Sequence, residues 1–179
     1  LLDREIILLD SDFTNNELIN LVGCSDFAEF NQPINGYKFS SINNYNDLIE
    51  RLRSKPKKWK ITLFTSGTTG IPKKVSHDYK RITRFVKISS QNHKSIWGFA
   101  YNPTHMAGMQ VFFQAILNGN QIVDIYKKSK QHIIESLLKS KATHLSGTPT
   151  FFRLLVPMSE KLTTVSKITM GAEPTSINL

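Results

Sequence analysis

The stretch Thr65-Ser66-Gly67-Thr68-Thr69-Gly70-Ile71-Pro72-Lys73 directly follows a β-rich run, and the interpretation of the whole chain starts from it. Its two glycines allow the backbone to turn N–H groups toward an anion. Its hydroxyl side chains add donors, and Lys73 supplies a full positive charge. The Walker A spacing is not met, because Gly67 and Gly70 are three residues apart and neither precedes Lys-Ser or Lys-Thr. The segment predicts a phosphate-binding loop of another kind, with an ordinary Ser/Thr/Gly connection as the alternative.

Strand-like and helix-like runs alternate regularly around this loop. The strand-like runs lie at 60–65, 95–100, 121–126, 142–146 and 166–170. The helix-like runs lie at 77–91, 106–117, 129–140 and 150–156, the last with Pro149 in its first turn. This alternation predicts an α/β fold with a mostly parallel sheet covered by helices on both faces. Ligands of such sheets bind beyond the carboxyl ends of the strands.

Residues 1–59 are expected to be a short lead-in to the same domain, because 179 residues correspond to about one domain. A strand is predicted at 6–9 and a helix at 45–52. A further helix is predicted at 14–22, capped by Thr14 with Glu17 three residues on. Residues 31–46 are rich in Asn, Ser and Gly and predict a loop.

The composition indicates an ordinary globular protein, with 40% hydrophobic and 21% charged residues. The net charge of +9 raises the possibility of a nucleic-acid partner. However, aromatic residues are not interleaved with the lysine and arginine runs, so a solvated basic surface is favoured and no nucleic-acid partner is expected. No apolar stretch reaches the roughly 18 residues of a membrane span. A lone Cys24 favours a cytoplasmic location, and no zinc-ligand spacing is present.

The segment 65–73 resembles the signature loop of the adenylate-forming superfamily, which includes AMP-binding acyl- and aryl-CoA synthetases, luciferases and peptide-synthetase adenylation domains. Three later segments agree with the family in order, at 101–108, 143–155 and 167–174. The resemblance implies that 60–179 is part of the large N-terminal domain of such an enzyme. Because the family's remaining motifs and its small C-terminal domain would lie beyond Leu179, a partial domain that is inactive alone is expected.

In that family, ATP and a carboxylic acid give an acyl-adenylate and pyrophosphate, and a thiol, most often of coenzyme A, then takes the acyl group. The resemblance implies a phosphate-binding set, with Mg²⁺ bridging phosphate oxygens, that consists of Thr65, Ser66, Gly67, Thr68, Thr69, Gly70 and Lys73. Thr68 and Lys73 would be catalytic. Gly171, Ala172 and Glu173 would border the adenine and acyl pocket, and His105 and Gly108 would lie near the acid. No protein side chain is expected to bind a metal directly.

Several alternatives stay open at this stage. Lys74 replaces the family's usual glycine, and the lead-in to the loop is shorter than in most members. His105 is either a pocket residue or a cap of the following helix, whereas His77 and His144 are expected to be structural. The paired phenylalanines at 112–113 and 151–152 are expected in the core. A non-catalytic nucleotide-binding or interaction module is the alternative to the ligase, and the acid is open among fatty, aryl, succinylbenzoyl and amino acids.

Overall fold

A computed structural model describes residues 5–23, 42–53, 58–65, 72–157 and 161–173. The strands are β1 (Glu5–Ile7), β2 (Lys60–Thr65), β3 (Lys73–Asp78), β4 (Ile96–Phe99), β5 (Gln121–Asp124), β6 (His144–Gly147) and β7 (Lys167–Met170). The helices are α1 (Asn15–Val22), α2 (Tyr45–Arg53), α3 (Tyr79–Ile82), the short 3₁₀ helix η2 (Ser90–Asn92), α4 (Met106–Ile116), α5 (Lys130–Ser140) and α6 (Pro149–Leu155). The strands form two sheets, in the orders β1-β2-β3 and β5-β4-β6-β7.

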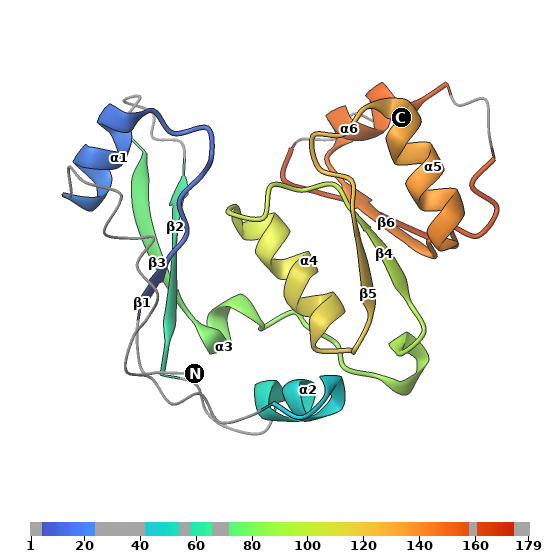
Figure 1. The fold of residues 1–179 in the computed structure, drawn as a ribbon, viewed down its shortest axis with the longest axis horizontal. Coiled ribbons are helices and arrows are strands. Elements are labelled where there is room, and N and C mark those ends of the chain that lie inside the picture. The colour runs from blue at the N-terminus through green and yellow to red at the C-terminus, as the bar shows by residue number, and fades with distance from the viewer. Residues whose placement is uncertain (1–4, 24–41, 54–57, 66–71, 158–160, 174–179) are drawn as a thin grey trace.

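The larger sheet confirms the predicted α/β fold. Its neighbouring strands all run parallel, with β4 between β5 and β6 and with β7 beside β6. Helices α4 and α5 and the connection through α6 cross between these strands, and Figure 1 shows α5 and α6 on one side of the sheet and α4 on the other. Buried Ile133, Leu137 and Phe152 from the helices pack with Leu145 of β6. The carboxyl ends of β4, β6 and β7 therefore meet at one edge, where a ligand site is expected.

The smaller sheet is mixed, which the sequence did not predict. Strand β1 pairs parallel with β2, whereas β2 and β3 form an antiparallel pair. Thr65, the last residue of β2, lies opposite Lys73, the first residue of β3. The predicted phosphate loop therefore starts and ends at neighbouring positions, although residues 66–71 lie outside the described part of the chain.

The helix expected over 77–91 is wrong. The chain continues as β3 through Asp78, and the helix that follows has only four residues. Pairing with β2 satisfies the backbone of this segment, and it turns His77 into the core, where the side chain is 6% exposed. Backbone pairing and alternate burial override the apolar spacing on which the helix was predicted. Tyr45 and Asn46, which fall in both the predicted loop at 31–46 and the predicted helix at 45–52, belong to α2, so that helix is confirmed; residues 31–41 of the loop are not described.

Local sequence signals fixed the ends of several helices as expected. The Thr14 hydroxyl accepts a hydrogen bond from the Glu17 N–H, and the Glu17 carboxylate accepts one from the Thr14 N–H, which is the predicted capping box. Pro149 occupies the first turn of α6 after the N-cap Thr148. These contacts satisfy backbone donors that a helix start leaves unpaired.

Helix α4 lies between the two sheets (Figure 1). Met109 and Phe113 on this helix pack with Ile61 and Leu63 of β2 and with Ile82 of α3. Its other side contributes to a cavity against the larger sheet, so α4 connects the two halves of the structure. In the described part of the chain, no helix has the length and apolar character of a membrane span.

Candidate active site

Two adjoining cavities lie beside α4. The first has a volume of about 460 Å³ and lies between α4, the segment from Ile82 to Asn92, and strands β4, β6 and β7. The second has a volume of about 520 Å³ and is lined by residues that include Leu8, Phe64, Thr65, Pro72 and His105. Ala107 and Ala172 line both cavities. The two spaces therefore meet at the start of α4 and the end of β7.

The ends of the predicted phosphate loop open onto the second cavity. Thr65 and Pro72 line this cavity, and Lys73 is exposed directly opposite Thr65 in the β2–β3 pair. The predicted site residues Ser66, Gly67, Thr68, Thr69 and Gly70 lie outside the described part of the chain, so their roles stay predictions. The structure thus brings the described ends of the loop to a cavity rather than into the core.

His105 faces Asp10, a residue that the sequence analysis did not identify. The imidazole Nε2 lies 3.5 Å from Asp10 Oδ2, and the His105 side chain is 60% exposed. His105 occupies the N-cap position of α4 but makes no capping hydrogen bond through its side chain. The structure therefore places the imidazole at the wall of the second cavity, beside the start of the helix.

Asp10 anchors the turn that leads into α4. Its carboxylate accepts hydrogen bonds from Asn102 Nδ2 at 2.5 Å, Thr104 Oγ1 at 3.1 Å and the Asp12 N–H at 3.0 Å. Burial raises the pKa of Asp10, but these hydrogen bonds outweigh burial, and the pKa lies below its ordinary value. Asp10 is thus a stable anion that holds the turn before His105. Asp10 lies three residues after β1, and its position beside His105 follows from the pairing of β1 with β2, which the sequence alone did not reveal.

The N-terminus of α4 suits a negatively charged ligand. Met106 and Ala107, in the first turn of this 11-residue helix, line the second cavity. The N–H groups of a first turn lack partners within the helix, and the helix dipole favours negative charge there. His105 provides no side-chain cap for these donors. This observation fits the phosphate-bearing ligand that the loop predicts.

Gly108 is buried on the opposite side of this turn and lines neither cavity. A Cβ atom at this position would lie 2.1 Å from the Asn102 carbonyl oxygen. The absence of a side chain lets α4 approach the turn at Asn102 and Pro103. The structure therefore places Gly108 where it supports the position of His105, without bringing it to the cavity wall.

The predicted site residues that follow β7 do not all lie at a cavity. Gly171 and Ala172 line the first cavity, and Ala172 adopts a φ of 68°. Glu173 lines neither cavity. Its carboxylate instead accepts hydrogen bonds from the Thr150 N–H at 3.1 Å and the Thr150 hydroxyl at 2.7 Å. The hydrogen bond from the Thr150 side chain lowers the pKa of Glu173. Glu173 thus ties the end of β7 to the first turn of α6.

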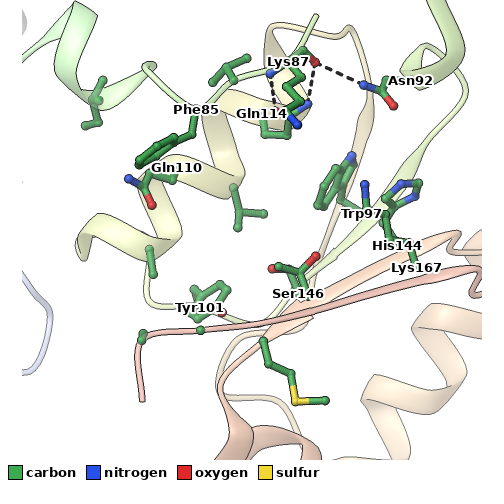
Figure 2. A pocket seen from close by; sticks show the side chains of 18 residues that line it. Phe85, Lys87, Asn92, Trp97, Tyr101, Gln110, Gln114, His144, Ser146 and Lys167 are labelled. Atoms are coloured by element: carbon green, nitrogen blue, oxygen red, sulfur yellow. Dashed lines mark hydrogen bonds between the residues drawn. The ribbon is translucent and has the colours of Figure 1, made fainter. Parts of the chain in front are cut away.

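The first cavity contains residues that sequence analysis treated as structural or did not consider. His144 lines it, with its ring 4.6 Å from that of Trp97 at an interplanar angle of 35°. Ser146 and Lys167 also line it, and Figure 2 shows these side chains together. A two-residue alternation along β6 and β7 was the available signal, because it places His144 and Ser146 on one face. The paired phenylalanines line neither cavity, and buried Phe113 and Phe152 belong to the core as expected, whereas Phe112 is exposed and Phe151 is partly buried.

No group of three or more His, Cys, Asp or Glu side chains is arranged to bind a metal ion within the described residues.

Parallel strands whose carboxyl ends open onto two adjoining cavities are typical of α/β proteins that bind small ligands. The AMP-binding enzyme family model matches residues 4–179, and the chain belongs to this family. The match begins within the lead-in, where the sequence segments themselves showed no resemblance. The family accounts for the arrangement of loop, helix and parallel sheet.

Relatives of this chain include two much larger biosynthetic proteins. One is a plipastatin synthase polypeptide of Bacillus subtilis (strain 168), which is 30% identical over 97 residues that cover 50% of this chain and 4% of the relative. Peramine synthetase ppzA of Metarhizium rileyi (strain RCEF 4871) is 26% identical over 141 residues, which cover 76% of this chain and 5% of the relative. The chain therefore spans only a small part of either protein.

The fold is shared with O-succinylbenzoate coenzyme A synthetase (MenE) of Bacillus subtilis. Its complex with AMP has a TM-score of 0.64 at 17% identity, covering 96% of this chain and 49% of that one. Its complex with ATP and magnesium ion has a TM-score of 0.64 at 16% identity, covering 94% of this chain and 39% of that one. The chain therefore has the fold of about half of an adenylate-forming enzyme.

Proposed function

We propose that the full-length protein containing this chain activates a carboxylic acid with ATP and then transfers the acyl group to a thiol. The observation that carries this proposal is the junction of the two cavities at Ala107 and Ala172. The phosphate-loop ends reach one cavity, and the other offers space for an organic acid. Such a junction brings a carboxylate next to a nucleotide phosphate.

In the first step, a carboxylate oxygen attacks the α-phosphorus of ATP, and the bond to the pyrophosphate oxygen breaks. Both reactants are anions, so the reaction needs fixed positive potential where they meet. The N-terminus of α4 supplies this potential, and His105 adds a hydrogen-bonding group beside it. Lys73 and the hydroxyls of Thr65 and Thr68 would hold the departing pyrophosphate. Mg²⁺, when bound with ATP, would neutralise charge on the phosphate oxygens.

In the second step, a thiol sulfur attacks the acyl carbonyl carbon, and AMP leaves. Coenzyme A is the proposed acceptor, which is supported by the shared fold with a coenzyme A synthetase. The likeness to plipastatin synthase and peramine synthetase keeps a carrier-protein thiol as the competing acceptor. An ATP-dependent activity also agrees with the cytoplasmic location proposed from the single cysteine.

ATP–pyrophosphate exchange by the full-length protein, across a panel of carboxylic acids with Mg²⁺, tests the adenylation step. Lys73→Ala and Thr68→Val are expected to lower the exchange rate at least about 100-fold, the usual effect of removing a group that stabilises a transition-state charge. Lys80→Ala, at an exposed position in α3, is the matched control and should retain activity. ATP binding without exchange for any acid would favour the non-catalytic module, and no ATP binding by calorimetry would overturn both alternatives.

A further inference from the structure

The first cavity runs along the face of the larger sheet, from the amino ends of its strands to their carboxyl ends. Lys167, Thr169 and Gly171 follow one another at two-residue steps on β7 and just after it, and all three line the cavity. A parallel strand rises about 3.3 Å per residue, so Lys167 and Gly171 are about 13 Å apart along the strand. The junction with the second cavity lies at the Gly171 end. Lys167 therefore marks the far end of the proposed acid pocket.

The far end is rich in cationic and hydrogen-bonding groups. Figure 2 shows Lys167 with Trp97 and His144, and Lys87, Asn92 and Gln114 across the same cavity. No Asp or Glu is among the described residues that line it. Neither Lys87 nor Lys167 forms a salt bridge in the described part of the chain. The positive charge of these ammonium groups is therefore not neutralised by a neighbouring carboxylate there.

The amides on the opposite wall are already committed to the fold. Gln114 Oε1 accepts a hydrogen bond from the Lys87 N–H at 2.9 Å, and Gln114 Nε2 donates to the Lys87 carbonyl at 3.0 Å. Asn92 Nδ2 donates to the same carbonyl at 3.2 Å. These hydrogen bonds hold the segment that carries Lys87 against α4, so the backbone of this wall is fixed. The Lys87 side chain stays exposed.

Ser146 supplies an independent indication of a polar ligand. Ser146 is 1% exposed and lines the cavity, and its hydroxyl lacks a well-formed hydrogen bond in the described part of the chain, with the Tyr101 hydroxyl as a polar neighbour. A buried hydroxyl without a partner is costly, and such groups in native proteins are normally satisfied. A ligand with an oxygen acceptor along its length would satisfy it. Burial lowers the pKa of His144, so its neutral imidazole adds no charge to those of Lys87 and Lys167 at this end.

We propose that the acid activated by this protein carries a second anionic group, most simply a second carboxylate, which binds at Lys167. This inference rests on the proposed function, because it assigns one carboxylate to the junction at Ala172 and the other to the far end. Subtracting the length of a lysine side chain from the distance between Lys167 and Gly171 along β7 gives the separation between the two bound carboxylates. That separation suits dicarboxylic acids with a spacer of about four to eight carbons or one aromatic ring. Trp97 and His144 offer stacked rings beside such a spacer.

The test is ATP–pyrophosphate exchange by the full-length protein with matched acid pairs: terephthalate against 4-methylbenzoate, and adipate and suberate against hexanoate and octanoate. At least one dicarboxylate is expected to exceed its monocarboxylate partner about tenfold in kcat/KM. Lys167→Met should reduce that dicarboxylate kcat/KM by about ten- to a hundredfold, mainly through KM, because it removes a charge-assisted hydrogen bond. The same substitution should change the monocarboxylate value by less than about threefold. Lys139→Met, at an exposed position in α5, should change neither.

Equal use of the paired acids, or an equal loss for both in Lys167→Met, would overturn this inference and leave adenylation standing. ATP binding with exchange only for monocarboxylates, or with no dicarboxylate accepted, would overturn it as well. Failure to bind ATP at all would overturn the proposed function, and this inference with it.

Discussion

Replacing Gly108 by alanine tests whether the close approach of α4 to the turn before it positions the site. The added Cβ would lie 2.1 Å from the Asn102 carbonyl oxygen and 2.9 Å from the Asn102 carbonyl carbon, both backbone atoms. A carbon–oxygen contact of roughly 3.3 Å is the close end of the ordinary range, so the helix and the turn must separate by about 1.2 Å. Because the clashing atoms are backbone, a side-chain rotation cannot relieve the contact.

The expected loss of stability follows from two opposing effects. Overpacking costs about 1 to 3 kcal/mol, with the upper end suited to a backbone clash. Exchange of glycine for alanine within a helix returns about 1 kcal/mol. The net loss should therefore be about 2 kcal/mol. Because Asn102 and His105 lie in the displaced turn, the exchange rate should also fall, and a shift of about 1 Å at a reacting group can cost about 100-fold.

Urea denaturation of the full-length protein, together with ATP–pyrophosphate exchange, measures both effects. Gly98→Ala in β4 is the matched control, because its nearest contacts would be side-chain ends, those of Leu137 at 2.7 Å, Leu145 at 2.8 Å and Ile125 at 3.4 Å. These ends can rotate, and they lie away from the turn, so activity should be retained better than in Gly108→Ala. A Gly108→Ala protein with unchanged stability and activity would refute the reasoning.

Two further predictions concern buried polar contacts. Asp10 has a folded-state pKa below its unfolded value, so it contributes stability that is present above the unfolded pKa near 3.8 and is lost as pH falls through the folded pKa. Asp10→Asn should remove this part of the loss of stability at acid pH, and urea denaturation midpoints between pH 7 and pH 3 measure it. An unchanged dependence of the midpoint on pH would contradict the role assigned to Asp10. Tyr101→Phe should cost about 1 kcal/mol, because the buried Tyr101 hydroxyl donates to the Gly147 carbonyl at 2.8 Å and its removal leaves that oxygen with the longer hydrogen bond from the Gly171 N–H, at 3.4 Å. Equal denaturation midpoints for the Tyr101→Phe and wild-type proteins would argue against that contact.

Local rules predicted α1, the strands of the larger sheet and the helices between them, because capping residues and the apolar pattern determine each of these elements. The Thr14–Glu17 box and Pro149 are examples in which a few neighbouring residues decide where a helix starts. The hairpin of β2 and β3 was missed because its stability comes from pairing across the loop at 66–72, which short-range spacing does not reveal.

The candidate site was predictable where residues follow strands in a recognisable motif, and less so where side chains from distant segments meet. His105 was found from its motif, whereas its partner Asp10 lies 95 positions earlier and could be placed only once β1 was paired with β2. Lys167 was not identified as a site residue, and His144 was predicted to be structural, for a similar reason. Their shared face depends on the parallel register of β6 and β7, which only the tertiary structure supplies.

The position of the first cavity on one face of the larger sheet bears on how such a protein can acquire new substrates. Residues that line it at Trp97, Ser146 and Thr169 point away from the hydrophobic layer that α5 and α6 form with the other face of the sheet. Under the proposed function, exchange of these lining side chains should alter selectivity while the layer behind them keeps its packing. Diversification of substrate and preservation of the scaffold would then fall to opposite sides of the same strands.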